Sequence, residues 1–119
     1  MKLLLVDDEI EFASSLAERL ILRGIDTDWS SSSQDALKKV EKKCYNVVVT
    51  DIKMPLMDGI ALKKKLQKKC PDMKFIFLTG HGSSEEFEAG VSETGADFYL
   101  LKPLQIEVLI EKINKVLNI

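Results

Sequence analysis

The sequence contains few of the residues that build disulfide frameworks or transition-metal sites. Its only cysteines are Cys44 and Cys70, and His81 is its only histidine. Two cysteines are too few for a disulfide scaffold or a cysteine-rich zinc site. A single histidine also argues against a histidine-based catalytic metal centre, and we expect His81 to be an exposed loop residue.

Long hydrophobic runs are absent as well. Apolar stretches such as Leu3–Val6 are far shorter than the roughly 20 residues that a membrane-spanning helix needs. This N-terminal stretch turns acidic at Asp7, whereas a signal peptide has about 7–15 apolar residues and a small-residue cleavage site. We therefore expect a cytoplasmic protein without membrane contact.

The net charge of −2 gives no sign of a nucleic-acid partner. Residues 1–33 carry 3 basic and 7 acidic side chains, residues 34–69 carry 10 and 4, and residues 70–119 carry 4 and 8. In the basic middle, Leu62 and Leu66 have the spacing of the inner face of a helix, so lysines 63–65 should be solvated. No aromatic residues interleave with them, as single-stranded nucleic acid would require. We expect no direct contact with nucleic acid.

Strand and helix patterns alternate along what we expect to be one domain, residues 1–119. Four short apolar runs are typical of buried strands: 3–6, 47–49, 75–78 and 98–101. Residues 25–29 alternate instead and predict an edge strand. Apolar residues at helical spacing follow each strand. The start and stop signals of these helices are Gly24 after the first, serines near 32, Asp58, Ser83–Glu86 and Pro103.

This (βα)5 pattern predicts an α/β fold of the doubly wound, flavodoxin-like type, with helices on both faces of a parallel five-stranded sheet. With the strand order 2-1-3-4-5, the first and third strands are neighbours. The polar residues Asp7, Asp8, Asp51, Thr79 and Lys102 each follow or end a strand. In open α/β sheets the ligand crevice lies at these carboxyl ends, so we expect the five side chains to gather there.

Carboxylates brought together repel one another, and a hard divalent cation relieves that repulsion. Oxygen ligands select Mg²⁺ or Mn²⁺ over zinc, and Mg²⁺ keeps positions for water and phosphate oxygens. A lysine ammonium and a threonine hydroxyl suit the oxygens of a phosphoryl group. The predicted chemistry is phosphoryl transfer, with a carboxylate as nucleophile.

The motifs LLLVDDE, VVVTDIKMPLMDG, FIFLTGHG and ADFYLLKPL occur in this order along the chain. With these motifs the sequence resembles a bacterial two-component response-regulator receiver domain over essentially its whole length. The resemblance implies that Asp51 accepts phosphate from a histidine kinase. It also implies that Asp7, Asp8, Asp51 and the backbone carbonyl of Lys53 hold Mg²⁺ or Mn²⁺.

The same resemblance implies that Lys102 and Thr79 contact the phosphoryl group and that Thr79 and Tyr99 form the conformational switch. The protein would then be a phosphorylatable switch rather than an enzyme, with only intrinsic phosphotransfer and autodephosphorylation chemistry. Its partners would be a sensor histidine kinase or a phosphotransfer protein, and an output partner at the face of the fourth helix, fifth strand and fifth helix. Glutamates such as Glu85 and Glu111 make that face acidic, so the output partner should present a basic patch.

Simpler interpretations of single residues stay open. Asp8 alone could cap the first helix, Tyr99 could be only a half-buried strand aromatic, and Lys102 before Pro103 could be a helix-start residue. Pro103 introduces an X-Pro bond, which the family resemblance predicts to be cis.

Two alternative functions are weighed against the receiver. A phosphatase of the haloacid-dehalogenase type also uses a strand-end aspartate and Mg²⁺, but it needs a second acid two residues after the nucleophile on the first strand. Asp7 is followed by Asp8 and Glu9, so that spacing is absent. The LTGHG motif also resembles receivers attached to sigma-54-type activators. Because the pattern stops at Ile119 after the fifth helix, we expect a stand-alone receiver, with a domain of a longer regulator as the alternative.

The two cysteines carry one further expectation. Cys44 precedes the third strand and Cys70 precedes the fourth, and these strands should be adjacent. Both thiols should therefore lie at the sheet edge opposite the phosphate site, within reach of each other. The favoured interpretation is nevertheless a pair of unrelated thiols, which is the usual state of cytosolic cysteines. A Cα separation above about 7 Å would exclude a bridge without backbone movement.

Overall fold

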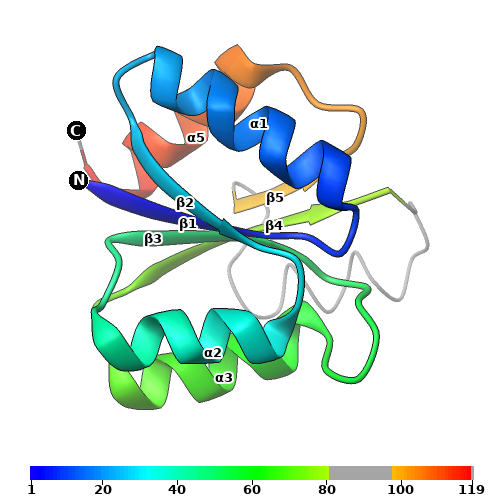
Figure 1. Cartoon of the computed structure of the whole chain (residues 1–119). Helices are drawn as coiled ribbons and strands as arrows, with labels where there is room; N and C mark the ends of the chain where they lie inside the picture. The colour runs from blue at the N-terminus through cyan, green and yellow to red at the C-terminus, as the bar shows by residue number, and fades with distance from the viewer. Residues whose placement is uncertain (81–97, 119) are drawn as a thin grey trace.

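The computed structural model describes residues 1–80 and 98–118 and shows one parallel sheet between two layers of helices (Figure 1). Its described strands are β1 (Lys2–Val6), β2 (Asp26–Ser30), β3 (Val47–Asp51), β4 (Lys74–Thr79) and β5 (Tyr99–Leu101). Its described helices are α1 (Ile10–Leu22), α2 (Ser33–Lys42), α3 (Gly59–Lys69) and α5 (Ile106–Val116). The strand order is β2-β1-β3-β4-β5 with all neighbours parallel, which confirms the predicted fold class.

Two hydrophobic cores hold the layers together. The helices α1 and α5 cover one face of the sheet, and α2 and α3 cover the other (Figure 1). Successive residues of β1 alternate between the cores, so that Leu3 and Leu5 pack toward α1 and α5 while Leu4 and Val6 pack toward α2 and α3. Because both faces are covered, the central strands have continuous apolar runs with polar residues only at their ends, as their sequence indicated.

The local signals at three helix ends are confirmed. Gly24 follows α1 with φ +84°, a left-handed conformation that glycine adopts without steric cost. The Ser32 hydroxyl accepts a hydrogen bond from the backbone N–H of Asp35, at 3.1 Å, and caps α2. The Asp58 carboxylate accepts one from Ala61 N–H, at 2.8 Å, and caps α3. The predicted fourth helix, with its signal at 83–86, lies outside the described residues.

One open alternative and one expectation about helix starts are wrong. Asp8 does not cap α1, because Glu9 occupies the N-cap position and its side chain makes no capping hydrogen bond. Pro103 does not begin α5, which starts at Ile106 after the N-cap residue Gln105. A proline fixes φ near −65° in loops as well as in first turns, so Pro103 alone could not locate the helix. The Lys102–Pro103 bond is cis, as the family resemblance predicted.

One expectation about exposure is wrong in part, and one open alternative is wrong. Lys64 and Lys65 are exposed as expected, but Lys63 is only 9% exposed. Its ammonium lies 5.7 Å from the centre of the Phe75 ring of β4 and donates to the Gln67 side chain, one turn along α3. Tyr99 is buried rather than half-buried, in a small cluster with Ile52 and Phe77.

Within residues 1–80 and 98–118, no helix combines the length and the hydrophobicity that a membrane span requires.

Candidate functional site

The acidic residues predicted from the sequence meet at the carboxyl edge of the sheet, on the right in Figure 1. Asp7 directly follows β1 and Asp51 ends β3, and these strands are hydrogen-bonded neighbours. Carboxylate oxygens of Asp7, Asp8 and Asp51 all lie within 4.8 Å of one another. Asp7 is fully buried and Asp51 is 6% exposed, whereas Asp8 is exposed. Two buried carboxylates therefore adjoin one that faces solvent.

Lys102 reaches this cluster from the end of β5. Its Nζ lies 2.6 Å from Asp7 Oδ2 and 3.3 Å from Asp51 Oδ2, and the lysine side chain is 11% exposed. Its ammonium also lies 4.4 Å from the centre of the Phe12 ring, a cation–π contact. Lys102 thus gathers with Asp7 and Asp51 at the carboxyl ends of the strands, as expected from the sequence. The ammonium supplies part of the positive charge that the carboxylates require.

Backbone hydrogen bonds orient the two buried carboxylates. Asp7 Oδ1 accepts from Glu9 N–H at 2.9 Å, and Asp51 Oδ1 accepts from Lys53 N–H at 3.4 Å. The backbone N–H of Asp7 donates to the Ser30 carbonyl of β2, so β2 fixes the point where the chain leaves β1. Each carboxylate thus has one oxygen held by its own loop and the other directed at Lys102.

Burial dominates the electrostatics of the site. Removal from water raises the pKa of Asp7, against the opposing effect of its hydrogen bond from Lys102. Burial likewise raises the pKa of Asp51, and the negative charge of Asp7 adds to that rise. Burial by itself lowers the pKa of Lys102, but the hydrogen bonds to Asp7 and Glu9 outweigh it and the pKa is raised. The lysine is thus held in its charged form, but its single positive charge does not offset the effect of burial on the pKa values of the two carboxylates.

Sequence reasoning missed one member of this cluster. Glu9 Oε1 lies 3.0 Å from Lys102 Nζ, so a third carboxylate shares the ammonium. The signal was present, because Glu9 continues the acidic run of Asp7 and Asp8. Its role nevertheless depends on Lys102, which is 93 residues away along the chain.

The donor set fits a hard divalent cation. Its oxygens come from carboxylates, and Asp8, Glu9, Asp51, Lys53 and Gly80 line a hollow of about 180 Å³ beside them. Mg²⁺ and Ca²⁺ prefer such oxygen ligands. A cation there would offset the buried negative charge that raises the two carboxyl pKa values.

The two predicted switch residues lie behind this edge. Thr79 is fully buried at the end of β4, and its carbonyl accepts a hydrogen bond of 2.7 Å from the backbone N–H of Lys102. Phe77 pairs with Tyr99 in the parallel register of β4 and β5. Both residues therefore belong to the two strands that position Lys102. The neighbouring loop with His81 lies outside the described residues.

Comparisons with known proteins find response regulators or their receiver domains. The family model described as the response regulator receiver domain matches residues 3–114. The response regulator MprA of Mycobacterium leprae (strain TN) is 32% identical over 118 residues, which are 99% of this chain and 51% of MprA. The chain thus spans about half the length of that relative.

Solved structures show the same likeness. The response regulator receiver domain protein of Clostridium thermocellum has 34% identity and a TM-score of 0.88, with 98% of this chain and 94% of that chain covered. A response regulator protein from Burkholderia pseudomallei, solved with a phosphorylated aspartic acid, calcium ion and citrate, has 29% identity and a TM-score of 0.82. That match covers 93% of this chain and 65% of the other.

Proposed function

The chain belongs to the response regulator receiver domain family, the phosphoacceptor modules of two-component signalling, and we propose that Asp51 is its phosphoacceptor. The observation that carries this proposal is the position of the Asp51 carboxylate. Its Oδ2 lies 3.3 Å from the Lys102 ammonium, and Asp51 also lines the hollow of about 180 Å³ beside the carboxylate cluster. Asp7 is fully buried and has its Oδ2 at 2.6 Å from Lys102, so it is the less accessible nucleophile.

In the proposed reaction, an Asp51 carboxylate oxygen attacks the phosphorus of a phosphohistidine. A new oxygen–phosphorus bond forms, the phosphorus–nitrogen bond breaks, and the imidazole leaves with the electron pair. Lys102 is already charged and next to Asp51, so its ammonium can move to the incoming phosphoryl oxygens. The Thr79 hydroxyl is the proposed second donor to those oxygens. Hydrolysis of the same acyl phosphate by water would reset the domain.

The proposed metal ligands are the carboxylates of Asp7, Asp8 and Asp51 and the backbone carbonyl of Lys53. When bound, Mg²⁺ or Mn²⁺ would neutralise charge on the transferring phosphoryl group. Exposed Asp8 leaves the cluster open to solvent, and buried Asp7 anchors it to β1. The related Burkholderia pseudomallei structure, described with a phosphorylated aspartic acid and a calcium ion, combines the same two elements.

Receiver domains interact with histidine kinases and with output domains. For this chain we propose, as one domain over residues 1–119, phosphotransfer in the cytoplasm from a sensor histidine kinase or a phosphotransfer protein. The output partner would bind the face that includes β5 and α5. Phosphate would reach that face through Thr79 and Tyr99, which lie on adjacent strands behind the site. The proposed basic character of the partner depends in part on glutamates in the predicted fourth helix, which lies outside the described residues.

The proposal is tested by exposing the protein to a small phosphodonor such as acetyl phosphate and measuring its intact mass. We expect one Mg²⁺-dependent, hydroxylamine-labile phosphate on the native protein and none on Asp51→Asn. The matched control is Asp58→Asn, because Asp58 lies in the following loop and asparagine also caps helices well. This control should be phosphorylated like the native protein. A labile phosphate on Asp51→Asn would overturn the assignment.

A further inference from the structure

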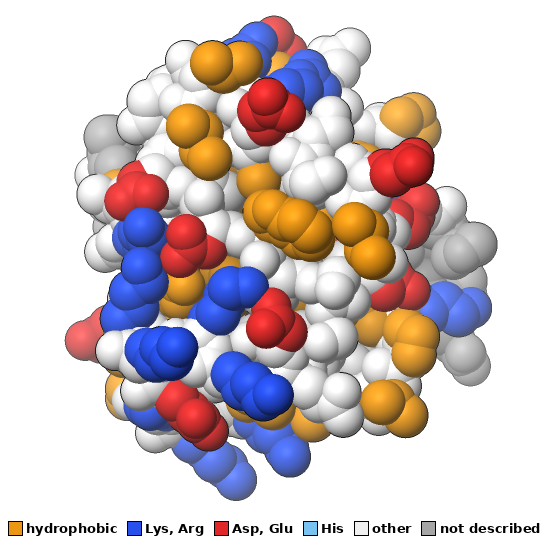
Figure 2. Space-filling model, viewed as in Figure 1, with side chains coloured by type: hydrophobic (Ala, Val, Ile, Leu, Met, Phe, Trp, Pro, Cys, Tyr) orange, Lys and Arg blue, Asp and Glu red, His pale blue; other side chains and the backbone are white. Residues whose placement is uncertain are grey.

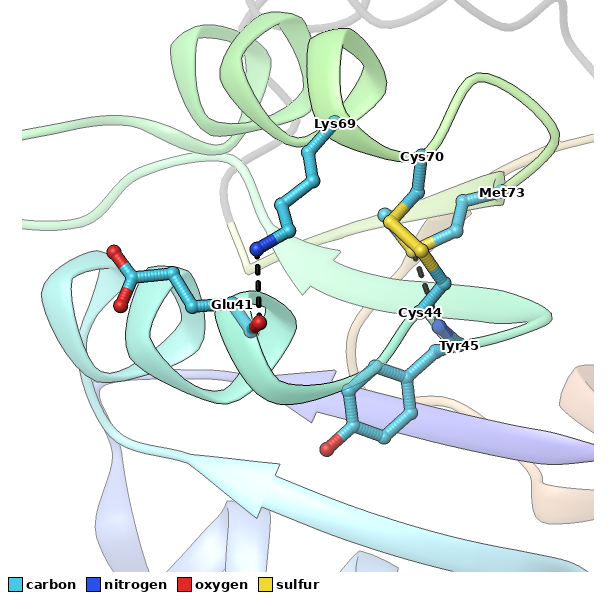
Figure 3. The surroundings of a disulfide bond; sticks show 6 residues. All are labelled: Glu41, Cys44, Tyr45, Lys69, Cys70 and Met73. Atoms are coloured by element: carbon cyan, nitrogen blue, oxygen red, sulfur yellow. Dashed lines mark hydrogen bonds between the residues drawn. A yellow bond between two sulfur atoms is a disulfide. The ribbon is translucent and has the colours of Figure 1, made fainter.

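A disulfide bond joins Cys44 and Cys70 at the sheet edge opposite Asp51 (Figure 3). Cys44 lies between α2 and β3, and Cys70 is the C-cap residue of α3. Their Cα atoms are 5.9 Å apart, so the expectation that the thiols are within reach is confirmed. The interpretation that the sequence favoured, two unrelated thiols, is wrong. We propose that this pair is a reversible thiol–disulfide exchange site that reacts with anionic low-molecular-weight thiols and disulfides.

The two sulfur-bearing residues differ sharply in exposure. Cys44 is exposed, whereas Cys70 is 4% exposed. Exchange requires an attacking thiolate to approach one sulfur of the bond. Cys44 is therefore the cysteine that an external thiol or disulfide meets, and Cys70 is the buried resolving cysteine. Redox-responsive cysteines commonly combine an accessible thiol with such a neighbour.

The reduced pair is held in position by contacts other than the bond itself. The Lys69 ammonium donates to the Glu41 carbonyl at 2.8 Å, which ties the end of α3 to the end of α2 (Figure 3). The backbone N–H of Tyr45 donates to the Met73 sulfur at 3.4 Å, which ties the segments that follow the two cysteines. These links do not depend on the bridge. They should keep the thiols close after reduction, so that re-closure is fast.

The surroundings of Cys44 are basic. Lys42 and Lys43 directly precede it, and Figure 2 shows lysine and arginine side chains gathered at the lower left, on the α2 side of the molecule. Cys44 and Cys70 line a hollow of about 430 Å³ together with two lysines, Lys69 and Lys74, and one acidic residue, Asp72. Helix carboxyl ends disfavour a thiolate, and nearby ammonium groups offset that effect. The same charges attract reagents that carry carboxylates, which explains the proposed preference for anions.

The proposed chemistry balances without a bound cofactor. The Cys44 thiolate attacks a low-molecular-weight disulfide, forms a mixed disulfide and releases one thiolate. The Cys70 thiolate then attacks the Cys44 sulfur, closes the protein bridge and releases the second thiolate. The protein loses two electrons and two protons, and the small disulfide becomes two thiols. Excess small thiol drives the same steps backwards.

The test follows pre-reduced protein mixed with glutathione disulfide by acid quench and intact mass. We expect native protein to close its bridge without accumulating an adduct. Cys70→Ser, which retains Cys44, should accumulate a stable mixed disulfide. Cys44→Ser, which retains buried Cys70, should react at least about tenfold more slowly, and urea should remove that difference. The proposal would be overturned if the two variants reacted with glutathione disulfide at equal rates in the absence of urea, or if the native protein did not close its bridge.

A second measurement has two parts, and the first needs no variant. Brief alkylation of reduced native protein, followed by peptide mapping, should label Cys44 well before Cys70. The second part uses Cys70→Ser: raising the salt concentration should slow its reaction with glutathione disulfide and speed its reaction with cationic cystamine, because salt screens the lysines. Salt-independent rates with both reagents would overturn the anionic preference.

Neither experiment requires a phosphodonor. The exchange should proceed equally in Asp51→Asn, since Cys44 and Cys70 lie at the other edge of the sheet. Loss of exchange with normal phosphorylation would overturn only the exchange site. Loss of phosphorylation with normal exchange would overturn only the proposed function.

Discussion

Tyr45 shows how one buried side chain sets the charge state of a partner. The tyrosine is 4% exposed, and its hydroxyl donates to Asp28 Oδ2 at 2.7 Å. Burial alone would raise the pKa of Asp28, but the hydrogen bonds from Tyr45 and Lys43 outweigh it and the pKa is lowered. Asp28 therefore stays charged to a lower pH than an ordinary aspartate does.

We predict that Tyr45→Phe lowers the free energy of unfolding by about 1 kcal/mol at neutral pH, because it removes a hydrogen bond to a partly exposed charged group. A carboxyl group whose pKa is lowered in the folded state stabilises the protein at pH values above its ordinary pKa of 3.8. This stabilisation is lost as the pH falls through the folded-state pKa. The gap between native protein and Tyr45→Phe should therefore narrow as the pH drops below about 4. Urea denaturation at a series of pH values measures the gap.

The control for this prediction is the double mutant Tyr45→Phe/Asp28→Asn. If the phenol acts through the Asp28 charge, the tyrosine substitution should cost less in the Asp28→Asn background. An equal cost in both backgrounds, with no change on acidification, would assign the effect to packing alone.

At the scale of elements, the start of α3 is pressed against the end of β3. The backbone N–H of Gly59 donates to the Ile52 carbonyl at 2.7 Å. A Cβ added at Gly59 would lie 2.3 Å from the backbone oxygen of Asp51, closer than side chains tolerate. The start of α3 therefore constrains the backbone of Asp51, the proposed phosphoacceptor.

We predict that Gly59→Ala lowers the free energy of unfolding by about 1–3 kcal/mol, because the clash with the backbone of Asp51 can only be relieved by moving α3 or β3. It should also slow phosphorylation of Asp51 by a small-molecule donor. Urea denaturation and the initial rate of mass gain measure the two effects.

The matched control is Gly24→Ala. Nothing lies within 4 Å of a Cβ at Gly24, but its φ is +84°. Alanine there should cost about 1 kcal/mol of backbone strain and leave phosphorylation unchanged. If Gly59→Ala and Gly24→Ala are both phosphorylated at the native rate, the close packing of α3 against β3 does not position Asp51 for phosphorylation.

At the scale of the whole molecule, the site brings together the ends of β1, β3 and β5. The carboxylates of Asp7 and Asp51 repel each other, and the Lys102 ammonium is paired with both. The folded-state pKa values of Asp7 and Asp51 are raised, so the folded protein without a cation binds protons more tightly than the unfolded chain. The contribution of these groups to stability therefore falls as pH rises above their ordinary value of 3.8. A cation that binds only the folded state should reverse this loss.

We predict that Mg²⁺ raises the free energy of unfolding by about 2.7 kcal/mol at a hundredfold excess over its Kd. The gain should shrink on acidification, as protons compete for Asp7 and Asp51, and it should be weaker in Asp8→Asn. Thermal unfolding with MgCl₂, against KCl at equal ionic strength, measures it. An unchanged melting temperature at millimolar Mg²⁺ would contradict the metal site.

The sequence by itself determined the fold class and the edge at which the site lies. Hydrophobic periodicity is a local property, and it marked where β1 and β3 end. Since parallel strands all end at one edge, Asp7, Asp51 and Lys102 had to converge there. Cap residues such as Ser32 and Asp58 could also be predicted from the sequence, because each side chain accepts a hydrogen bond from the helix that directly follows it.

Only the tertiary structure decided which side chains touch across the fold. The contact of Glu9 with Lys102, the burial of Lys63 and the bond between Cys44 and Cys70 all depend on it. Pro103 likewise could not show that α5 begins at Ile106. The physical reason is that these features depend on strand register and helix packing between distant segments. Hydrophobic periodicity along the chain indicates whether a segment is a helix or a strand. It does not give the distance between the side chains of that segment and those of its neighbours in the fold.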